Sequence, residues 1–163
     1  MLARFGREPT EVKAILEREL SAFSALPARL TDVWSLPVRP GTWSPAQVTD
    51  HVRLVNVAMS KVLRLLRQDE PLPNATRIPA TVIEGRVQAP AFAVPGLAQP
   101  WVMLEGPWLE MVARLQREVA ATDVWHGRTW FHPYFGDLDA LGWAASASLH
   151  MAHHRKQLGA TRQ

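Results

Sequence analysis

The chain has 163 residues, of which 47% are hydrophobic and 20% are charged, a balance typical of a globular protein. Its 18 Lys and Arg residues against 15 Asp and Glu give a net charge of only +3, and the cations are scattered, which argues against a nucleic-acid partner. Cysteine is absent, so disulfides, thiolate metal sites and a cysteine nucleophile are excluded, and a transition-metal site would have to use His, Asp or Glu.

Length and hydropathy predict a single domain over residues 1–163. No apolar run reaches the roughly 18 residues needed to span a bilayer. The first residues, MLARFGREPT, lack the apolar stretch of a signal peptide. We therefore expect a cytoplasmic protein that does not bind membranes.

The first predicted helix covers residues 10–30. Thr10 is its expected N-cap, with Glu11 in the first turn. Pro27 should bend or end the helix. The apolar residues fall near one face, as expected of an amphipathic core helix: Val12, Ile15, Leu16, Leu20, Phe23 and Leu30.

The second predicted helix begins after a proline-containing linker at 31–42 and runs to about Arg67. Ser44 is the expected N-cap, Pro45 suits the first helical position, and Gln47 completes a capping box. His51 falls on the apolar face of this helix. A histidine there is either a hydrogen-bonded core residue or a metal ligand, because a buried imidazole needs one partner or the other.

Residues 68–100 form a long connection that six prolines keep from becoming a helix. The run 80–83 favours a short strand or ribbon. Because its apolar residues need burial, we expect the connection to fold over the helices. These residues are Ile78, Val82, Ile83, Val87, Phe92 and Val94.

Residues 101–121 repeat apolar residues at helical spacing and predict a third helix, which Gly106 and Pro107 would delay or kink. Residues 122–138 read as an aromatic loop that packs into the mouth of the bundle. It contains His126 and also His132, which we interpret as structural or, at most, as a residue that orients a metal ligand.

The last predicted helix, 143–158, carries His150, His153 and His154. Asp137 or Asp139 would cap it and Gly159 would end it. Four residues on a helix correspond to about 40° of rotation and roughly 6 Å of rise, so His150 and His154 can share one metal ion. The alternative is a solvated helix end, where histidine suits the helix dipole. Four helices with long crossover connections predict an all-α four-helix bundle.

Three motifs, in this order, resemble those of the DinB-like family: WSPAQVTDHV at 43–52, HPYFGDL at 132–138 and HMAHHRKQL at 150–158. The resemblance covers essentially the whole chain. It implies a four-helix bundle with a three-histidine metal site, whose ligands would be His51, His150 and His154. Relatives in that family include thiol transferases that use bacillithiol and mycothiol-dependent isomerases.

Further residues are candidates for supporting roles. His153, Asp50 and Gln157 would orient the ligands, and Trp43 and Trp143 would wall a pocket, although packing alone accounts for these tryptophans equally well. Asn56 and Glu84 are other polar residues that could lie near the metal. No single general base stands out.

The ligand type does not distinguish zinc, nickel and iron. The first functional hypothesis is a metal-dependent enzyme, either a thiol S-transferase that acts on small electrophiles or a hydrolase, with a low-molecular-weight thiol as co-substrate in the first case. The alternative is a non-catalytic metal- or ligand-binding stress-response bundle. A small-molecule substrate and a homodimer are further expectations.

Overall fold

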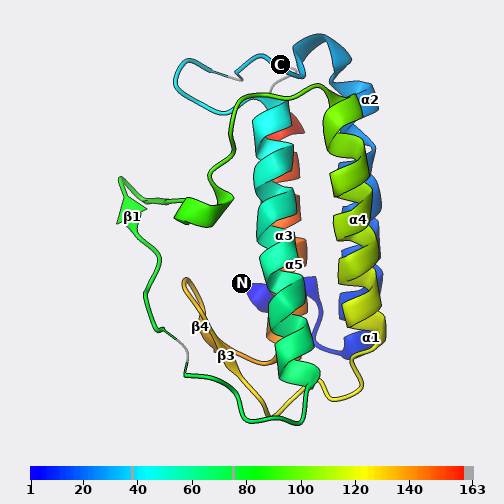
Figure 1. Ribbon diagram of the computed structural model, residues 1–163, viewed down its shortest axis with the longest axis vertical. Helices are drawn as coiled ribbons and strands as arrows, with labels where there is room; N and C mark the ends of the chain where they lie inside the picture. The colour runs from blue at the N-terminus through cyan, green and yellow to red at the C-terminus, as the bar shows by residue number, and fades with distance from the viewer. Residues whose placement is uncertain (38, 75, 160–163) are drawn as a thin grey trace.

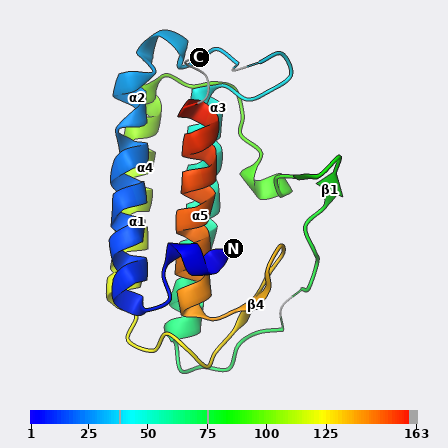
Figure 2. The same ribbon diagram turned by 180° about the vertical axis from the view of Figure 1, so that it is seen from behind.

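The computed structural model describes residues 1–37, 39–74 and 76–159. Four long helices lie side by side: α1 (Pro9–Ser24), α3 (Pro45–Arg67), α4 (Trp101–Ala120) and α5 (Ala140–Gly159). α1 and α5 run in one direction, and α3 and α4 run in the other (Figures 1 and 2). The predicted four-helix bundle is confirmed, and the parallel arrangement of α3 and α4 explains why a long connection must return between them.

Helix α3 starts as predicted. The Ser44 side chain accepts a hydrogen bond from the Gln47 amide, and the Gln47 side chain accepts one from the Ser44 amide, which is a complete capping box. Helix α1 differs from the prediction, because it begins at Pro9 with Glu8 rather than Thr10 as N-cap. A proline at the first helical position is preorganised for the helix and needs no amide hydrogen bond there.

Short elements occupy the connections. The first predicted helix ends at Ser24, and a separate turn of helix, α2 (Leu26–Arg29), contains Pro27. Three 3-10 helices are also present: η1 (Leu2–Phe5), η2 (Thr31–Val33) and η3 (Ala91–Ala93). Helix α4 begins at Trp101 without delay and accommodates Pro107 within it.

The connection between α3 and α4 carries a small antiparallel ribbon, β1 (Val82–Ile83) with β2 (Arg86–Val87), in the region predicted to be β-leaning. The prediction that its apolar residues are buried is wrong. Their exposed fractions run from 50% to 68%, because the ribbon projects away from the bundle (Figure 1). These are Ile78, Val82, Ile83, Val87, Phe92 and Val94.

The segment between α4 and α5, predicted as a loop, contains a second antiparallel hairpin, β3 (Trp130–His132) with β4 (Gly136–Leu138). Asp139, one of the two predicted caps, caps α5, because its carboxylate accepts from the Gly142 amide at 2.9 Å. Asp137 instead lies in β4. Gly159 is the last helical residue that the structure describes.

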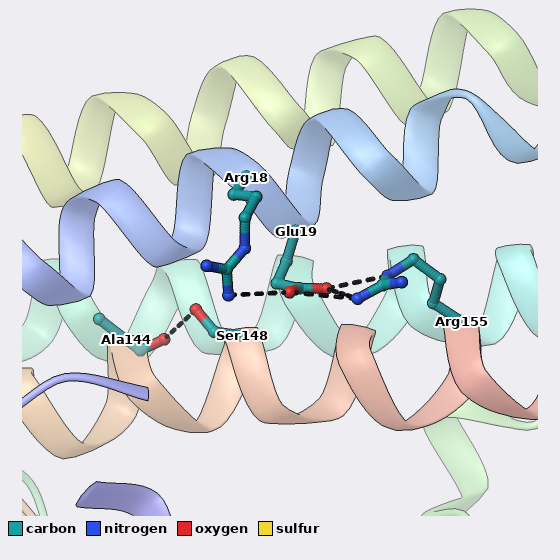
Figure 3. A network of polar contacts seen from close by, with 5 residues as sticks. All are labelled: Arg18, Glu19, Ala144, Ser148 and Arg155. Carbon is teal, nitrogen blue, oxygen red and sulfur yellow. Dashed lines mark hydrogen bonds and ion pairs between the residues drawn. The ribbon is translucent and has the colours of Figure 1, made fainter. Parts of the chain in front are cut away.

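Helix α5 is buried on several sides because it packs against α1, α3 and η1. Residues 144–148 are all at most 2% exposed, and all are alanine or serine. Such small side chains let neighbouring backbones approach closely. The Ser148 hydroxyl is satisfied within the helix by the Ala144 carbonyl at 3.3 Å (Figure 3).

One buried ion pair links α1 to α5. The Glu19 carboxylate, 2% exposed, accepts hydrogen bonds from Arg155 at 3.0 and 3.3 Å and from Arg18 at 3.3 Å (Figure 3). Because Arg155 directly follows His154 in the chain, this pair bears on how the histidine-carrying turns of α5 are held. No helix in the described part of the chain is long and apolar enough to cross a membrane.

Candidate metal centre

His51 lies in the second turn of α3, and His150 and His154 lie in the second half of α5. Because α3 and α5 are antiparallel neighbours, these two stretches meet at the same end of the bundle (Figures 1 and 2). The capping box sets where α3 begins, and so sets the height of His51. The exposed fraction of His51 is only 5%, which makes it part of the interior.

The hydrogen bonds of His51 determine its tautomer. Its Nδ1 lies 2.8 Å from the carbonyl oxygen of Ala93, in η3. A carbonyl oxygen can only accept, so Nδ1 carries the proton and Nε2 presents a lone pair. This Nε2 lies 3.1 Å from Nε2 of His150, which must then be the donor when both rings are neutral.

His150 is left with an unsatisfied atom. Its Nδ1 is buried and has no hydrogen-bond partner among the described residues. A buried nitrogen without a partner is costly, and the neutral ring can carry its proton on either nitrogen. Moving the proton to Nδ1 would free Nε2 as a lone pair that faces the lone pair of His51, an arrangement that favours a cation between them.

His154 completes the group. Its Nδ1 lies 3.0 Å from the side-chain oxygen of Gln157, which can only accept, so Nδ1 carries the proton and Nε2 is a free lone pair. One ring nitrogen from each of His51, His150 and His154 can be chosen so that all lie within 4.8 Å of one another. Metal–nitrogen bonds of about 2.1 Å would place ligand nitrogens roughly 3–3.5 Å apart. The Nε2 atoms of His51 and His150, 3.1 Å apart, already meet that spacing. The ligand nitrogen of His154, at most 4.8 Å from the other two, would have to move closer by a rotation of its ring.

Burial keeps these rings neutral. It lowers the pKa of His51, although the Ala93 carbonyl and the charge of Asp50 act in the opposite direction. Burial also lowers the pKa of His150 well below its ordinary value, with further lowering from the neighbouring histidines, and lowers the pKa of His154 to about 3. Neutral imidazole is the form that binds a metal, so no proton has to leave at physiological pH.

The other predicted residues differ in their proximity to the centre. Gln157 contacts His154 directly. His153 is exposed, with its ring 5.1 Å from that of His154. The Asp50 carboxylate pairs with Arg53 at 2.8 Å, so it acts on His51 only through its charge.

The two tryptophans differ in what they contact. The ring of Trp43 lies 5.0 Å from that of His51. Trp143, 6% exposed, donates to the Trp130 carbonyl at 3.2 Å and has the ring of His132 at 4.8 Å. Trp43 therefore packs against the centre, whereas Trp143 packs against the β3–β4 hairpin, about two turns of α5 before His150.

Three further polar residues form no hydrogen bond with the three histidines in the described part of the chain. Asn56 is fully buried, and neither of its amide atoms has a partner among the described residues. Glu84 is in the turn of the projecting β1–β2 ribbon, with a positive φ of 50°. His126 pairs with Asp139 at 2.7 Å.

Ala93 was missed by sequence reasoning, because its contribution is a main-chain oxygen that no side-chain pattern indicates. Two open cavities also lie outside the centre, and neither is lined by the three histidines. One of about 500 Å³ lies beside Trp34 and Trp101, and one of about 240 Å³ lies beside α2 and the end of α5.

Comparison with solved structures gives an informative similarity. A search against family models found no match, and a search of curated proteins found none either. Among solved structures, the chain matches one described as the crystal structure of TT2238, a four-helix bundle protein, with a TM-score of 0.71 and 30% sequence identity. Because the match covers 94% of this chain and 99% of the other, the chain belongs to the same family of four-helix-bundle proteins as TT2238.

Proposed function

We propose that this chain is a metal-dependent enzyme of the DinB-like class, in which His51, His150 and His154 hold one divalent metal ion. Its most concrete form is a thiol S-transferase that joins a low-molecular-weight thiol, of the bacillithiol type, to a small electrophile. The observation that carries the proposal is the convergence of three neutral imidazoles, with two Nε2 atoms 3.1 Å apart.

The donor set supports the metal proposal more strongly than the HxxxH spacing alone. Metal-bound histidines commonly donate their second ring N–H to a carbonyl or carboxylate, which fixes the ring orientation. Here Ala93 O does so for His51, and Gln157 Oε1 does so for His154. Zinc, nickel and iron all accept imidazole, so the proposal is for a divalent ion from this group.

The composition of the three-histidine group favours transfer over hydrolysis, since Asp50, whose charge reaches His51, is paired with Arg53. Among the described residues, no Asp or Glu joins the three-histidine group. Hydrolysis would benefit from a general base beside the attacking water. A thiol needs none once it is ionised, and a bound divalent metal lowers the pKa of a coordinated thiol so that the thiolate forms at neutral pH.

In the proposed reaction, the thiol gives up its proton to solvent and its sulfur forms a C–S bond with the electrophilic carbon. The leaving group departs with the electron pair of its bond to that carbon. The chain contributes the neutral ligands and the aromatic surroundings of Trp43 and Trp143. A ring such as Trp43, which lies against His51, would keep some water from the ionised sulfur and so make it more reactive.

The same observation leaves a second candidate, a bundle that binds a metal or ligand without catalysis. Its support is the missing general base. One measurement distinguishes the transferase from the non-catalytic bundle, because only an enzyme would accelerate thiol consumption in proportion to its metal content.

Metal content tests the first half of the proposal. Wild-type protein should bind close to one equivalent of Zn²⁺, Ni²⁺ or Fe²⁺ in equilibrium dialysis, while His51→Ala and His154→Ala should lose it and keep most of their helical circular dichroism. His153→Ala is the matched control and should bind like wild type. Equal occupancy in all variants would show that the ligands are other residues.

Thiol-consumption assays test the second half. Metal-loaded protein should accelerate loss of a thiol in the presence of an epoxide or an alkyl halide, and His51→Ala should not. A metal-loaded protein that is inert towards a broad panel of electrophiles would favour the non-catalytic bundle.

A further inference from the structure

His132 is placed by the β3–β4 hairpin, away from the three histidines in sequence but near them in space. Its ring lies 4.8 Å from that of Trp143 and 4.9 Å from that of Phe135. The hydrogen bond from Trp143 Nε1 to the Trp130 carbonyl ties the same hairpin to α5. The ring of His132 therefore contacts both α5 and its own hairpin turn.

The hairpin also determines which nitrogen of His132 carries the proton. Nδ1 accepts hydrogen bonds from the backbone amides of Tyr134 at 3.1 Å and Phe135 at 3.4 Å. A nitrogen that accepts has no proton of its own, so the neutral ring is protonated at Nε2. Burial lowers the pKa of His132 to about 4, which keeps the ring neutral at physiological pH.

The Nε2–H group has no partner among the described residues. It is thus a fixed donor with nothing in the described chain to donate to. Neutral imidazole with its proton on a defined nitrogen can act as a hydrogen-bond donor to a ligand oxygen without giving up the proton.

Its position relative to the three histidines follows from α5. Trp143 and His150 are seven residues apart, which places them on one helix face within about 20° and roughly 10 Å along the axis. A positive charge on His132 would lower the pKa of His150, so the two rings are within electrostatic reach. The His132 ring, in contact with Trp143, therefore lies toward the N-terminal side of His150 along α5 and within electrostatic reach of it.

We infer that His132 is a substrate-binding residue, whose Nε2–H donates to an acceptor oxygen on a ligand with its sulfur at the three-histidine centre. The inference rests on the proposed function and specifies its substrate class. The preferred thiols are those with a carboxylate or carbonyl a few atoms from the sulfur, because a site that offers only a donor selects an acceptor.

Two substitutions separate the roles of the two ring nitrogens. The amide oxygen of Asn can replace Nδ1 as acceptor in the hairpin turn, so His132→Asn keeps the turn and removes the distal donor. The amide nitrogen of Gln can replace Nε2–H, so His132→Gln keeps the donor and removes the turn acceptor.

The experiment uses protein loaded with Co²⁺, in which sulfur binding is read from the charge-transfer absorption. The probes are 3-mercaptopropionate, 4-mercaptobutanoate and 1-propanethiol, the last of which has no acceptor oxygen. In wild type, at least one of the two carboxylate thiols should bind about tenfold more tightly than 1-propanethiol, the gain of one good hydrogen bond. That ratio should fall to near one in His132→Asn and stay within about twofold of wild type in His132→Gln.

The outcomes distinguish this inference from the function on which it rests. Failure of wild-type protein to take up Co²⁺ overturns the proposed function and this inference together. Normal Co²⁺ uptake with the same thiol ratio in wild type and His132→Asn overturns the inference alone. An equal loss of the ratio in both variants, with normal Co²⁺ uptake, assigns His132 to the hairpin and also overturns it.

Discussion

At the scale of single residues, the orientation of two of the three imidazoles is determined by a hydrogen bond at the ring nitrogen that faces away from the centre. Ala93 O and Gln157 Oε1 accept from Nδ1 of His51 and His154, so both present Nε2 to the centre. His150 has no such acceptor among the described residues, which leaves its tautomer to be set by whatever binds between the rings.

Gln157→Ala should weaken metal binding without abolishing it. The variant keeps all three ligands and loses only the acceptor for His154 Nδ1–H. Because such supporting groups are worth 10- to 100-fold in affinity and Gln157 is exposed, we expect a loss of about tenfold. Competition with a chromogenic chelator measures it. Lys156→Ala, an exposed neighbour, is the control, and an equal loss there would contradict the role of Gln157.

The metal-free protein should lose stability as the pH falls from 7 to 5. The pKa of His154 is about 3 in the folded protein against 6.5 for the free side chain, so the unfolded chain binds the extra proton. The contribution of His154 to the free energy of unfolding is therefore at its full value above pH 6.5 and becomes steadily less favourable as the pH falls towards 3. By pH 5 this one group costs about 2 kcal/mol.

Urea unfolding in the presence of a chelator checks this dependence. His154→Gln should show a shallower fall over the same range, because that group no longer titrates. A free energy of unfolding that is flat between pH 7 and 5 in the wild type would contradict the prediction.

The grouping of the three histidines could be anticipated from sequence, and the residues that contact them only in part. The spacing of His150 and His154 follows from helix geometry alone, and the family resemblance implied His51. Gln157, one turn from His154, was a reasonable candidate for the same geometric reason. Asp50 was expected to orient a ligand, but its carboxylate is paired with the Arg53 guanidinium.

At the scale of elements, α1 and α5 are joined by a carboxylate that is nearly inaccessible to water. Removing one partner of such a pair leaves a buried charge, which costs more than the pair itself contributes. The two arginines around Glu19 differ in exposure, with side chains 40% exposed for Arg155 and 66% for Arg18.

Arg155→Met should therefore lower the free energy of unfolding by about 2–3 kcal/mol, below the full cost of an isolated buried charge because Arg18 remains. Arg18→Met is the matched control and should cost less than about 1 kcal/mol, since that contact is largely solvated. Chemical denaturation of the metal-free proteins measures both. Equal losses would mean that Glu19 does not depend on Arg155.

Element boundaries were predictable where local chemistry is decisive. The capping box and Pro45 specify the start of α3 without help from tertiary contacts. At α1, Pro9 supplied an equally good start one residue before the predicted Thr10 cap. The β3–β4 hairpin was missed because three-residue strands produce too little alternation to recognise.

At the scale of the whole molecule, α3 and α4 run in the same direction, so the chain must cross the length of the bundle between them (Figure 1). The crossover is tied at its start by Arg77, which pairs with Asp137 at 2.8 Å. Between the Arg77–Asp137 ion pair and η3, the connection leaves the bundle as the β1–β2 ribbon. Hydrophobicity alone predicted burial there, because a sequence does not show how far a connection must reach.

Limited trypsin digestion should cut first after Arg86. The ribbon has two-residue strands with every residue exposed, and an isolated two-stranded ribbon is marginally stable. Mass spectrometry should give fragments 1–86 and 87–163. Early cleavage within α3 or α5 would contradict this. Protection of Arg86 that disappears on dilution would indicate that a second copy covers the ribbon, as expected if the protein is a homodimer.

The acceptor for His51 is a peptide carbonyl, and no amino-acid replacement can delete it. Tolerance at position 93 is thus governed by available room rather than by chemistry, since that alanine is fully enclosed. What would misplace the oxygen is a change in the number of residues between α3 and α4. Single-residue insertions or deletions near η3 should be more damaging to the metal centre than point replacements in the same stretch.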